Sequence, residues 1–322
     1  MTELVTVDPH DPDPAALARP AAALRAGRLV AFPTETVYGL GAHARDAEAV
    51  QGIFAAKGRP ASNPLIVHVA DRDALPRLVA AVTPLAAALA RRWWPGPLTL
   101  VLDAAADVPA ITTGGLSTVA VRAPDHPVAR ALLRTAAVPV AAPSANRSGR
   151  PSPTRAAHVR ADLEGAIDWI VDGGACMVGV ESTVVDARGE QPLVLREGAI
   201  TREDLGSGGA ASPEDHRRSP GTRFRHYAPA CAVELAPPGE GPARAQALAD
   251  QGQRVGLVAT QPAPPGVEPV AAFGSAAELA STLYDALRRA EASGVAVLVV
   301  EGVPEEGVGR AVMDRLRRAA QG

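Results

Sequence analysis

Cysteine is scarce in this 322-residue sequence, in which Cys176 and Cys231 are the only two. Neither has a second cysteine or a suitably spaced histidine nearby, which excludes a zinc site and a disulfide framework, so we expect two free thiols. No apolar run approaches the ~20 residues of a membrane-spanning helix, and no basic-then-apolar leader with a cleavage site is present. We therefore expect a cytoplasmic protein that makes no membrane contact.

Positive charge is also limited. Lysine is nearly absent, and 32 Lys and Arg residues are outnumbered by 35 Asp and Glu residues, which gives a net charge of −3. A chain without an overall positive field is poorly suited to holding a polyanion such as tRNA. Strong direct nucleic-acid binding is therefore not expected, and any such contact should be local or indirect.

Several catalytic motifs are missing. The sequence has no HExxH, no G-x-S-x-G and no Walker loop, which excludes ordinary metalloproteases, serine hydrolases and P-loop enzymes. The stretch "YGLGAHA" at 38–44 matches the loosest dinucleotide-binding fingerprint. The match is weak, because Pro33 ends the preceding strand too early and no acidic residue closes a second strand about twenty residues later.

The remaining pattern is that of an α/β protein. With 47% hydrophobic residues the chain can form two cores, and ~100–200 residues per domain favours two domains. Short β-rich runs bounded by Gly, Pro, Asp or Asn predict strands at 28–32, 64–70, 97–103, 117–123, 138–142, 168–172, 182–187 and 192–197. Apolar residues at three- and four-residue spacing predict helices at 14–26, 46–57, 84–92 and 126–136. We expect this domain to cover residues 8–205.

Residues 206–230 are rich in Gly, Ser, Pro and Arg and follow neither period, so we interpret them as a linker. Beyond them, strand-like runs at 231–236, 254–260, 269–273 and 295–302 alternate with helical patterns at 242–251, 275–293 and 308–320. This alternation predicts a second α/β domain over 231–322 with a small parallel or mixed sheet.

Polar residues cluster where predicted strands give way to loops. They are Lys57, Arg59, Arg122, Ser144, Asn146, Ser182 and Thr183. Strand ends are where ligands bind in open α/β sheets, and a lysine next to an arginine can hold adjacent phosphates. These residues therefore suit the phosphates of a nucleotide.

Structural explanations are also open for the same residues. Lys57 and Arg59 could end a helix, where cations complement the helix dipole. Ser144 and Asn146 could form a turn after a proline. His68 alternates with apolar residues on one strand, and an isolated histidine there is more often a buried core residue than a ligand.

Taken together, the motifs resemble the YrdC-like threonylcarbamoyl-AMP synthase family in its long two-domain form. They occur in order along nearly the whole chain: "FPTETVYGLG", "K-x-R-P-x-x-NPLIVH", "WPGPLT", "STVAVR-x-P-x-HP", "APSAN-x-SG-x-PSPT", "DGG", "GVESTVVD", "LREGAIT", "SPGTRFRHYAP" and "GVPEEGVGRAVMDRLRRA". The resemblance implies a YrdC-like twisted mixed sheet with flanking helices, joined by a long linker to a smaller Rossmann-like α/β domain. It also implies that L-threonine, bicarbonate and ATP are condensed to threonylcarbamoyl-AMP and pyrophosphate, the first step of tRNA threonylcarbamoyladenosine synthesis.

The resemblance also implies roles for individual residues. Lys57, Arg59, Ser144 and Asn146 correspond to the catalytic K-x-R and S-x-N tetrad that faces the polyphosphate. Further ATP contacts correspond to Asn63, Thr118, Ser152 and Arg196. L-threonine recognition corresponds to Thr36, His68, Arg122, the backbone near Ala142, and Ser182, which moves His68 from the core to the site. No protein side chain is expected to bind metal, since Mg²⁺ would be held through the phosphates of ATP.

Family members use the linker as a lid over the nucleotide. The linker contains Arg223, Arg225, His226 and Tyr227, and we expect it to close on ATP with Tyr227 in contact. A solvated tether is the alternative interpretation. The downstream partner would be the tRNA threonylcarbamoyl transferase complex.

Two other functions compete with adenylate synthesis. An RNA-binding or tRNA-maturation accessory module without adenylate synthesis is disfavoured by the acidic balance. A hydrogenase-maturation factor would need an acylphosphatase-like domain and Cys-rich fingers, which this sequence does not contain.

Overall fold

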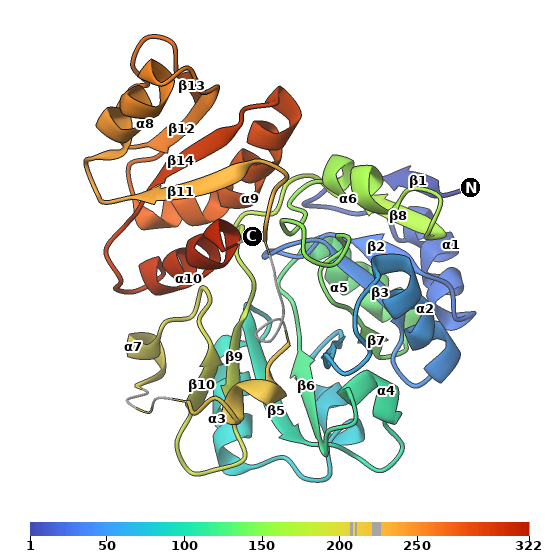
Figure 1. Cartoon of the computed structure of the whole chain (residues 1–322). Coiled ribbons are helices and arrows are strands. Elements are labelled where there is room, and N and C mark those ends of the chain that lie inside the picture. The colour runs from blue at the N-terminus through green and yellow to red at the C-terminus, as the bar shows by residue number, and fades with distance from the viewer. Residues whose placement is uncertain (207–208, 210, 221–226, 322) are drawn as a thin grey trace. The chain divides into compact units, whose positions relative to one another are not determined.

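The computed structural model describes residues 1–206, 209, 211–220 and 227–321 (Figure 1). The chain divides into two compact units. The first unit comprises Met1–Ser148, Pro153–Met177 and Glu181–Arg223, and the second comprises Gly149–Ser152, Val178–Val180 and Phe224–Gly322. Two short loops from the middle of the sequence therefore belong to the second unit.

The first unit is built on a ten-stranded mixed sheet in the order β1-β8-β2-β3-β7-β4-β6-β5-β9-β10. The strands are β1 (Glu3–Thr6), β2 (Val30–Phe32), β3 (Gly39–His43), β4 (Ile66–His68), β5 (Leu98–Asp103), β6 (Thr118–Arg122), β7 (Val140–Ala141), β8 (Trp169–Asp172), β9 (Thr183–Asp186) and β10 (Leu193–Arg196). All eight strands predicted for this region are confirmed, with ends that shift by at most two residues.

Helices cover the sheet on both faces. They are α1 (Pro14–Arg25), α2 (Ala47–Lys57), α3 (Pro84–Trp93), α4 (Ala110–Thr113), α5 (Pro127–Ala136), α6 (Ala156–Leu163) and α7 (Arg202–Leu205), with 3₁₀ turns η1 (Arg72–Arg77) and η2 (Asp215–Arg218). α1 and α5 pack against each other over β2 and β8. α2 and α3 contribute to the larger core on the opposite face. The four helices predicted for this unit are all present.

Local sequence explains where the helix that carries Lys57 begins and ends. Asp46 caps α2 by accepting from the amides of Glu48 and Ala49. Gly58 ends it in the left-handed region with φ of 61°, a conformation that glycine adopts without steric cost. The helix therefore ends at Lys57, and the chain turns at Gly58 toward Arg59.

The weak dinucleotide-binding match is wrong. Residues 39–43 form β3, which pairs antiparallel with β2 and with β7. A Cβ at Gly41 would lie 2.8 Å from Val140 Cγ1, so glycine there allows close packing between neighbours. Because the glycines belong to a buried strand, they do not form a phosphate-binding loop.

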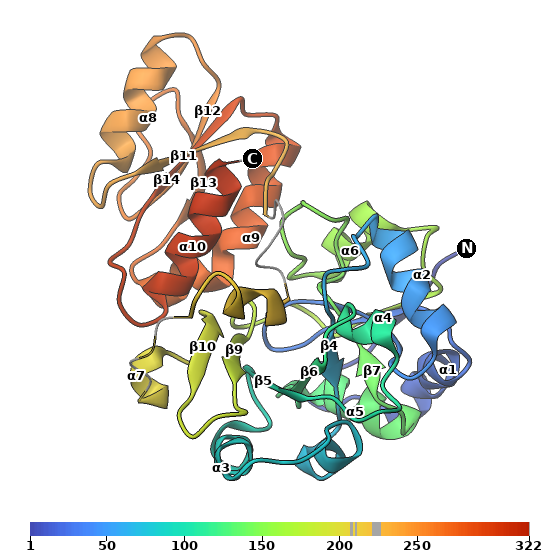
Figure 2. The same ribbon diagram turned by 60° about the horizontal axis from the view of Figure 1, so that its bottom comes forward.

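The second unit contains a four-stranded parallel sheet in the order β11-β14-β12-β13. Its elements are β11 (Ala232–Ala236), α8 (Gly241–Asp250), β12 (Val255–Ala259), β13 (Glu268–Ala272), α9 (Ala276–Ser293), β14 (Val297–Glu301) and α10 (Gly309–Ala320). Figure 2 shows α8 on one side of these strands and α9 with α10 on the other. The sequence predicted these strands and helices correctly.

Helix α9 holds the two short loops within the second unit. Arg150 forms an ion pair with Glu291 at 2.7 Å, and buried Arg288 donates to the carbonyl of Pro151. Gly179 approaches α9 so closely that a Cβ there would lie 2.3 Å from the carbonyl oxygen of Ala280. The loop at 178–180 therefore requires glycine at this point.

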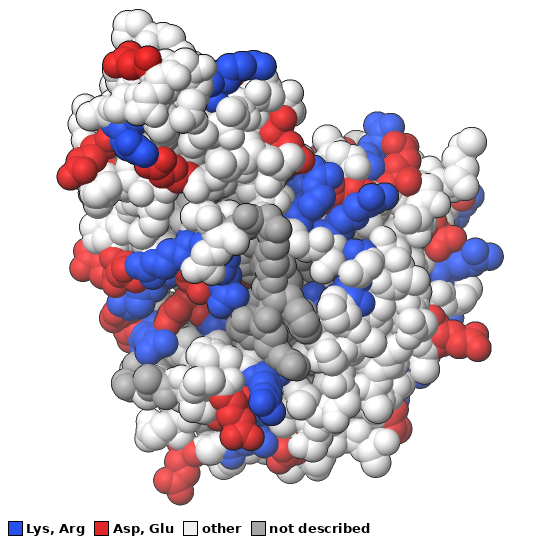
Figure 3. Space-filling model, in the orientation of Figure 1, with Lys and Arg blue, Asp and Glu red and all other residues white. Residues whose placement is uncertain are grey.

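Basic and acidic side chains are intermingled on the face drawn in Figure 3. Among the described residues, the structure contains no helix that is both long enough and apolar enough to cross a membrane. Both cysteines are free thiols, Cys176 buried and Cys231 half-buried.

Candidate functional site

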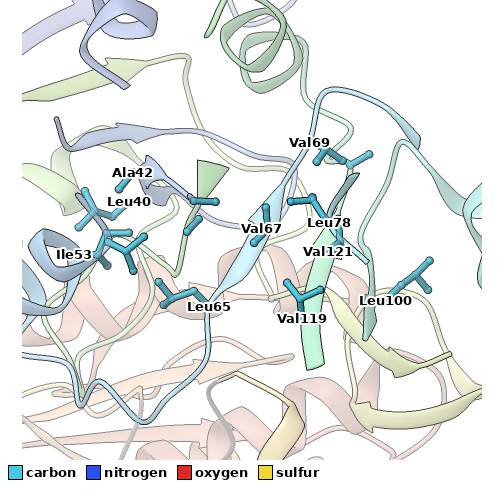
Figure 4. Packing of buried hydrophobic residues seen from close by; sticks show 14 of the residues in the cluster. Leu40, Ala42, Ile53, Leu65, Val67, Val69, Leu78, Leu100, Val119 and Val121 are labelled. Atoms are coloured by element: carbon cyan, nitrogen blue, oxygen red, sulfur yellow. The ribbon is translucent and has the colours of Figure 1, made fainter. Parts of the chain in front are cut away.

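The candidate site lies on one face of strands β4, β6, β5 and β9. Side chains alternate along these strands, so that Val67, Val119 and Val121 point into the core of the first unit (Figure 4). The opposite face carries His68, Thr118 and Arg122, together with a small apolar cluster. That cluster consists of Ile66, Val101, Ala120, Val184 and Leu195. Polar groups therefore border an apolar floor, a combination that suits a small-molecule site.

Arg122 is a buried cation on this face. It is 3% exposed, and its guanidinium lies 2.7 Å from the carboxylate of Glu35, which is 4% exposed. Nη1 donates to Thr36 Oγ1 at 2.9 Å, and Nε donates to the carbonyl of Gly96 at 3.2 Å. The register pairs Arg122 with His68 on the neighbouring strand. The structure therefore brings together three of the predicted threonine-binding residues.

The hydroxyl of Thr36 has a defined direction. Thr34 Oγ1 donates to the carbonyl of Val37 at 2.7 Å, so its oxygen accepts from Thr36 Oγ1 at 2.8 Å. Arg122 in turn donates to Thr36. A chain of hydrogen bonds thus runs from Arg122 through Thr36 to Thr34 and fixes the end of the arginine side chain.

His68 is neutral in this environment. It is 3% exposed, and burial, followed by the nearby charge of Arg122, lowers its pKa to about 3. Nδ1 lies 3.2 Å from the carbonyl of Ile66, and the ring packs edge-on against Phe32 at 6.1 Å between centroids. A neutral imidazole can exchange hydrogen bonds with a ligand without adding charge.

Lys57 lies at the end of α2 and reaches the loop after β7. Its ammonium donates to the carbonyls of Ser144 and Asn146, and Asn146 Oδ1 lies 3.4 Å away. Ser144 Oγ donates to Asn146 Oδ1 at 2.6 Å. Lys57 is also the only lysine in the sequence. Three members of the predicted tetrad are therefore in mutual contact.

Arg59, the fourth member, folds back on the turn that follows it. Its Nη2 donates to the carbonyl of Pro64 at 3.0 Å and lies 3.5 Å from that of Asn63. Arg59 is 9% exposed and Asn63 is 1% exposed. The structure thus groups these two predicted ATP-binding residues at the entry to β4.

Arg196 and Ser182 are held together although they were predicted to contact different substrates. Arg196 Nη2 donates to the carbonyl of Ser182 at 2.8 Å, and Nη1 donates to that of Pro220 at 3.0 Å. The hydroxyl of Ser182 lies 2.7 Å from that of Thr99. One arginine therefore connects the start of β9 to the chain before residue 221.

Two further predicted residues lie on the same part of the sheet. Thr118 begins β6 and is 4% exposed. Ala142 follows β7, and its N–H donates to the carbonyl of Ile66 at 2.8 Å. The backbone group that Ala142 can offer a ligand is therefore its carbonyl.

The predicted nucleotide-binding residues Ser152 and Tyr227 belong to the second unit. Ser152 is 1% exposed in the loop that α9 holds. The ring of Tyr227 stacks on Tyr284 of α9 with 5.3 Å between centroids, and Arg315 lies 5.9 Å from the ring centre. The other linker residues of the lid hypothesis, Arg223, Arg225 and His226, lie outside the described residues.

Glu35 and Cys176 were not predicted from the sequence. Glu35 is a buried carboxylate beside a buried arginine, yet in sequence it is only the acidic residue between two threonines of "TET". Cys176 is 5% exposed, and burial raises the pKa of its thiol, so it remains protonated. No local pattern indicates either position, because the contacts come from β6 and from distant loops.

The described residues offer no cage for a metal ion. No group of three or more His, Cys, Asp or Glu side chains in this part of the chain is arranged to hold one. The donors of the site are cations, hydroxyls and amides, which are suited to anionic ligands.

Two family models match the sequence. A Sua5/YciO/YrdC model, described as "Telomere recombination", matches residues 22–198. A model described as "Threonylcarbamoyl-AMP synthase, C-terminal domain" matches residues 195–321. Together they span nearly the whole chain.

Individual proteins are similar over their full length. A threonylcarbamoyl-AMP synthase of Bacillus subtilis is 45% identical, covering 99% of this chain and 95% of its own. One from Pyrococcus abyssi is 44% identical over 92% of both chains. The crystal structure of P. abyssi Sua5 complexed with L-threonine superposes with a TM-score of 0.91 at 40% identity, covering 99% of this chain and 98% of that one.

Proposed function

Because the chain belongs to the threonylcarbamoyl-AMP synthase family, we propose that the residues gathered around Arg122 and Lys57 carry out its reaction. The protein is an enzyme that condenses L-threonine, bicarbonate and ATP to threonylcarbamoyl-AMP and pyrophosphate for tRNA threonylcarbamoyladenosine synthesis. The residues of the site divide between a threonine end and a polyphosphate end.

The threonine end of the site is assigned to Arg122 and its neighbours. The planar guanidinium matches the two oxygens of a carboxylate, and the bonds to Thr36 and Gly96 fix its direction. Neutral His68 exchanges a hydrogen bond with the hydroxyl of threonine. Ser182 and the carbonyl of Ala142 complete the contacts.

The polyphosphate end is assigned to Lys57, Arg59, Ser144 and Asn146. The atoms that hold Lys57 are neutral oxygens, so they position the ammonium without cancelling its charge. The single lysine of the sequence lies here, where its compact charge fits between the carbonyls of Ser144 and Asn146 and the larger guanidinium of an arginine would not. This arrangement is the observation that carries the proposal.

The remaining ATP contacts are assigned to Asn63, Thr118, Ser152, Arg196 and Tyr227. The apolar cluster around Ala120 and Val184 supplies a surface for the flat base. Since the carbamate attacks the α-phosphorus, this assignment requires the α-phosphate to lie between the threonine end and the polyphosphate end.

The chemistry requires orientation and charge more than a protein nucleophile. The amine of threonine loses a proton and attacks bicarbonate, water leaves, and a carboxylate is formed on nitrogen. One oxygen of that carboxylate attacks the α-phosphorus of ATP and displaces pyrophosphate. Lys57 and Arg59 stabilise the charge that grows on the leaving group.

Magnesium enters this proposal only with ATP. When ATP is bound, Mg²⁺ would be held through its phosphate oxygens and would neutralise part of the phosphate charge. The net charge of −3 and the mixed charges on the face drawn in Figure 3 support an enzyme that passes its product to the tRNA threonylcarbamoyl transferase complex without binding tRNA strongly.

Pyrophosphate release tests the proposal. The purified protein should release pyrophosphate from ATP only when L-threonine and bicarbonate are both present. Omitting either should reduce release to background. Absence of release together with tight tRNA binding would instead support the RNA-binding alternative.

A further inference from the structure

We propose that Glu35 binds the α-ammonium group of threonine and so makes the site specific for an amino acid. This inference rests on the proposed function, since it concerns the same substrate. The observation behind it is a buried carboxylate that is close to a cation but poorly bonded to it. Glu35 Oε1 lies 2.7 Å from Arg122 Nη2. Even so, neither carboxylate oxygen has a hydrogen-bond partner among the described residues, and neither does Arg122 Nη2.

The burial of this pair makes the missing hydrogen bonds costly. The side chains of Arg122 and Glu35 are 4% and 5% exposed, so water contributes little. An ion pair whose facing atoms lack hydrogen bonds is only partly compensated there for the hydration that its charges would have in solvent. A ligand that supplies an acceptor for Arg122 and a donor for Glu35 would recover that loss.

An amino-acid zwitterion supplies both groups at once. Its carboxylate can accept from Arg122, and its ammonium can donate to Glu35. The bound state then alternates negative and positive charges: Glu35, the ammonium, the carboxylate and Arg122. The Glu35–Arg122 pair and the zwitterion each carry no net charge, so binding exchanges one ion pair within the protein for two with the ligand.

The groups around Glu35 leave it as the acceptor for the ammonium. Arg122 is a donor, and the hydroxyl of Thr36 already donates its hydrogen bond to Thr34. Cys176 and His126 interact electrostatically with Glu35, but burial keeps the first protonated and lowers the pKa of the second. Among the groups described here, Glu35 is therefore the negatively charged acceptor beside the guanidinium of Arg122.

Calorimetric titration with two ligands tests the assignment. L-threonine is compared with (R)-3-hydroxybutanoate, which keeps the carboxylate and the hydroxyl but lacks the amine. The wild-type protein should bind threonine about 10- to 100-fold more tightly, the range for a hydrogen bond between charged groups. In Glu35→Gln this preference should fall to within about threefold, because the amide keeps the shape and loses the charge. Glu35→Asp should retain part of the preference.

Glu301→Gln is the matched control. Glu301 is 2% exposed, accepts from Thr260 at 2.8 Å, and also has one carboxylate oxygen without a hydrogen-bond partner among the described residues. It lies in the second unit, so this variant should keep the wild-type preference. The control separates loss of ammonium binding from the general effect of neutralising a buried carboxylate.

Two results would overturn the inference while leaving the proposed function intact. One is wild-type protein that binds threonine and hydroxybutanoate equally well. The other is Glu35→Gln protein with an undiminished preference for threonine. If Glu35→Gln does not fold, the relative affinities of wild-type protein and of Glu35→Asp for threonine and hydroxybutanoate test the inference instead. Wild-type protein that bound neither compound would overturn the proposed function together with the inference.

Discussion

Arg196 connects Ser182 to Pro220: one nitrogen of its guanidinium donates to the first carbonyl and another to the second. The strand that follows Ser182 and the chain that precedes residue 221 are therefore fixed by a single buried side chain. A lysine could reach only one of these carbonyls with comparable geometry. Under the proposed assignment, Arg196 positions Ser182, a threonine contact, in addition to making its own contact with ATP.

Arg196→Lys should consequently lower the enzyme's efficiency with both substrates. We expect kcat/KM to fall about 10- to 100-fold for ATP and for threonine alike, as for loss of a charge-assisted hydrogen bond. Steady-state pyrophosphate release with each substrate varied in turn measures this. Arg160→Lys, on the exposed Arg160–Glu164 pair, is the control and should behave as wild type. An effect on ATP alone would contradict a shared role.

Lys57 should not be replaceable by arginine. Its ammonium is surrounded by the carbonyls of Ser144 and Asn146, and the larger guanidinium cannot occupy the same position. We expect Lys57→Ala to lower kcat by about 10²–10³, the usual effect of removing one group that stabilises transition-state charge. Lys57→Arg should show a loss of the same order, with kcat remaining below about a tenth of the wild-type value. Full activity in Lys57→Arg would show that any cation suffices.

His68 should make the protein less stable in acid. Its pKa is lowered from 6.5 to about 3 by burial and by Arg122. Above pH 6.5 neither the folded nor the unfolded state binds the proton, and below that value only the unfolded state does. Stability should therefore be lost as pH falls from 6.5 toward 3, by up to about 1.4 kcal/mol per pH unit.

His68→Gln tests this pH dependence. Urea unfolding at several pH values between 4 and 7 should show a shallower loss of stability for His68→Gln than for wild type. The exposed His10→Gln variant provides the comparison and should follow the wild-type curve. Parallel curves for His68→Gln and wild type would mean that His68 titrates normally in the folded state.

Gly179→Ala should destabilise the loop that packs on α9. Its new Cβ would lie 2.3 Å from the oxygen of Ala280 and 2.5 Å from Ser281 Cα, in addition to the strain of a φ of +76°. Gly266 has a similar φ of +83° but open space around it, so Gly266→Ala carries only the strain. We expect Gly179→Ala to cost about 1–3 kcal/mol more than Gly266→Ala, the range for overpacking. Thermal unfolding of both variants measures the difference, and equal melting temperatures would contradict the close contact.

The sequence predicts the sheet better than it predicts the site. Runs such as "STVAVRA" and "STVVDA" alternate and are bounded by turn residues, so the strands they form could be located to within two residues. β3 was missed because "GLGAH" is rich in glycine, which is usually typical of a loop. Its glycines are required by side chains from β2 and from Val140, which no local pattern reveals.

For the site, motif resemblance grouped the right segments but gave no partners. Lys57, Ser144 and Asn146 were placed in one tetrad, and they do contact one another. The bond from Arg196 to Ser182 and the ion pair of Arg122 with Glu35 were not foreseen. The first joins the ends of the paired strands β9 and β10, and the second joins the loop after β2 to β6, and short motifs specify neither pairing.

The interleaving of the two units affects how the protein is made on the ribosome. The loops at Gly149–Ser152 and Val178–Val180 are synthesised before α9, the helix that holds them. At ~5–20 residues per second, the gap of roughly a hundred residues lasts on the order of ten seconds. During that interval the segments flanking Asn146 and Ser182 lack their final packing, so the nascent enzyme becomes competent only after its second unit has emerged.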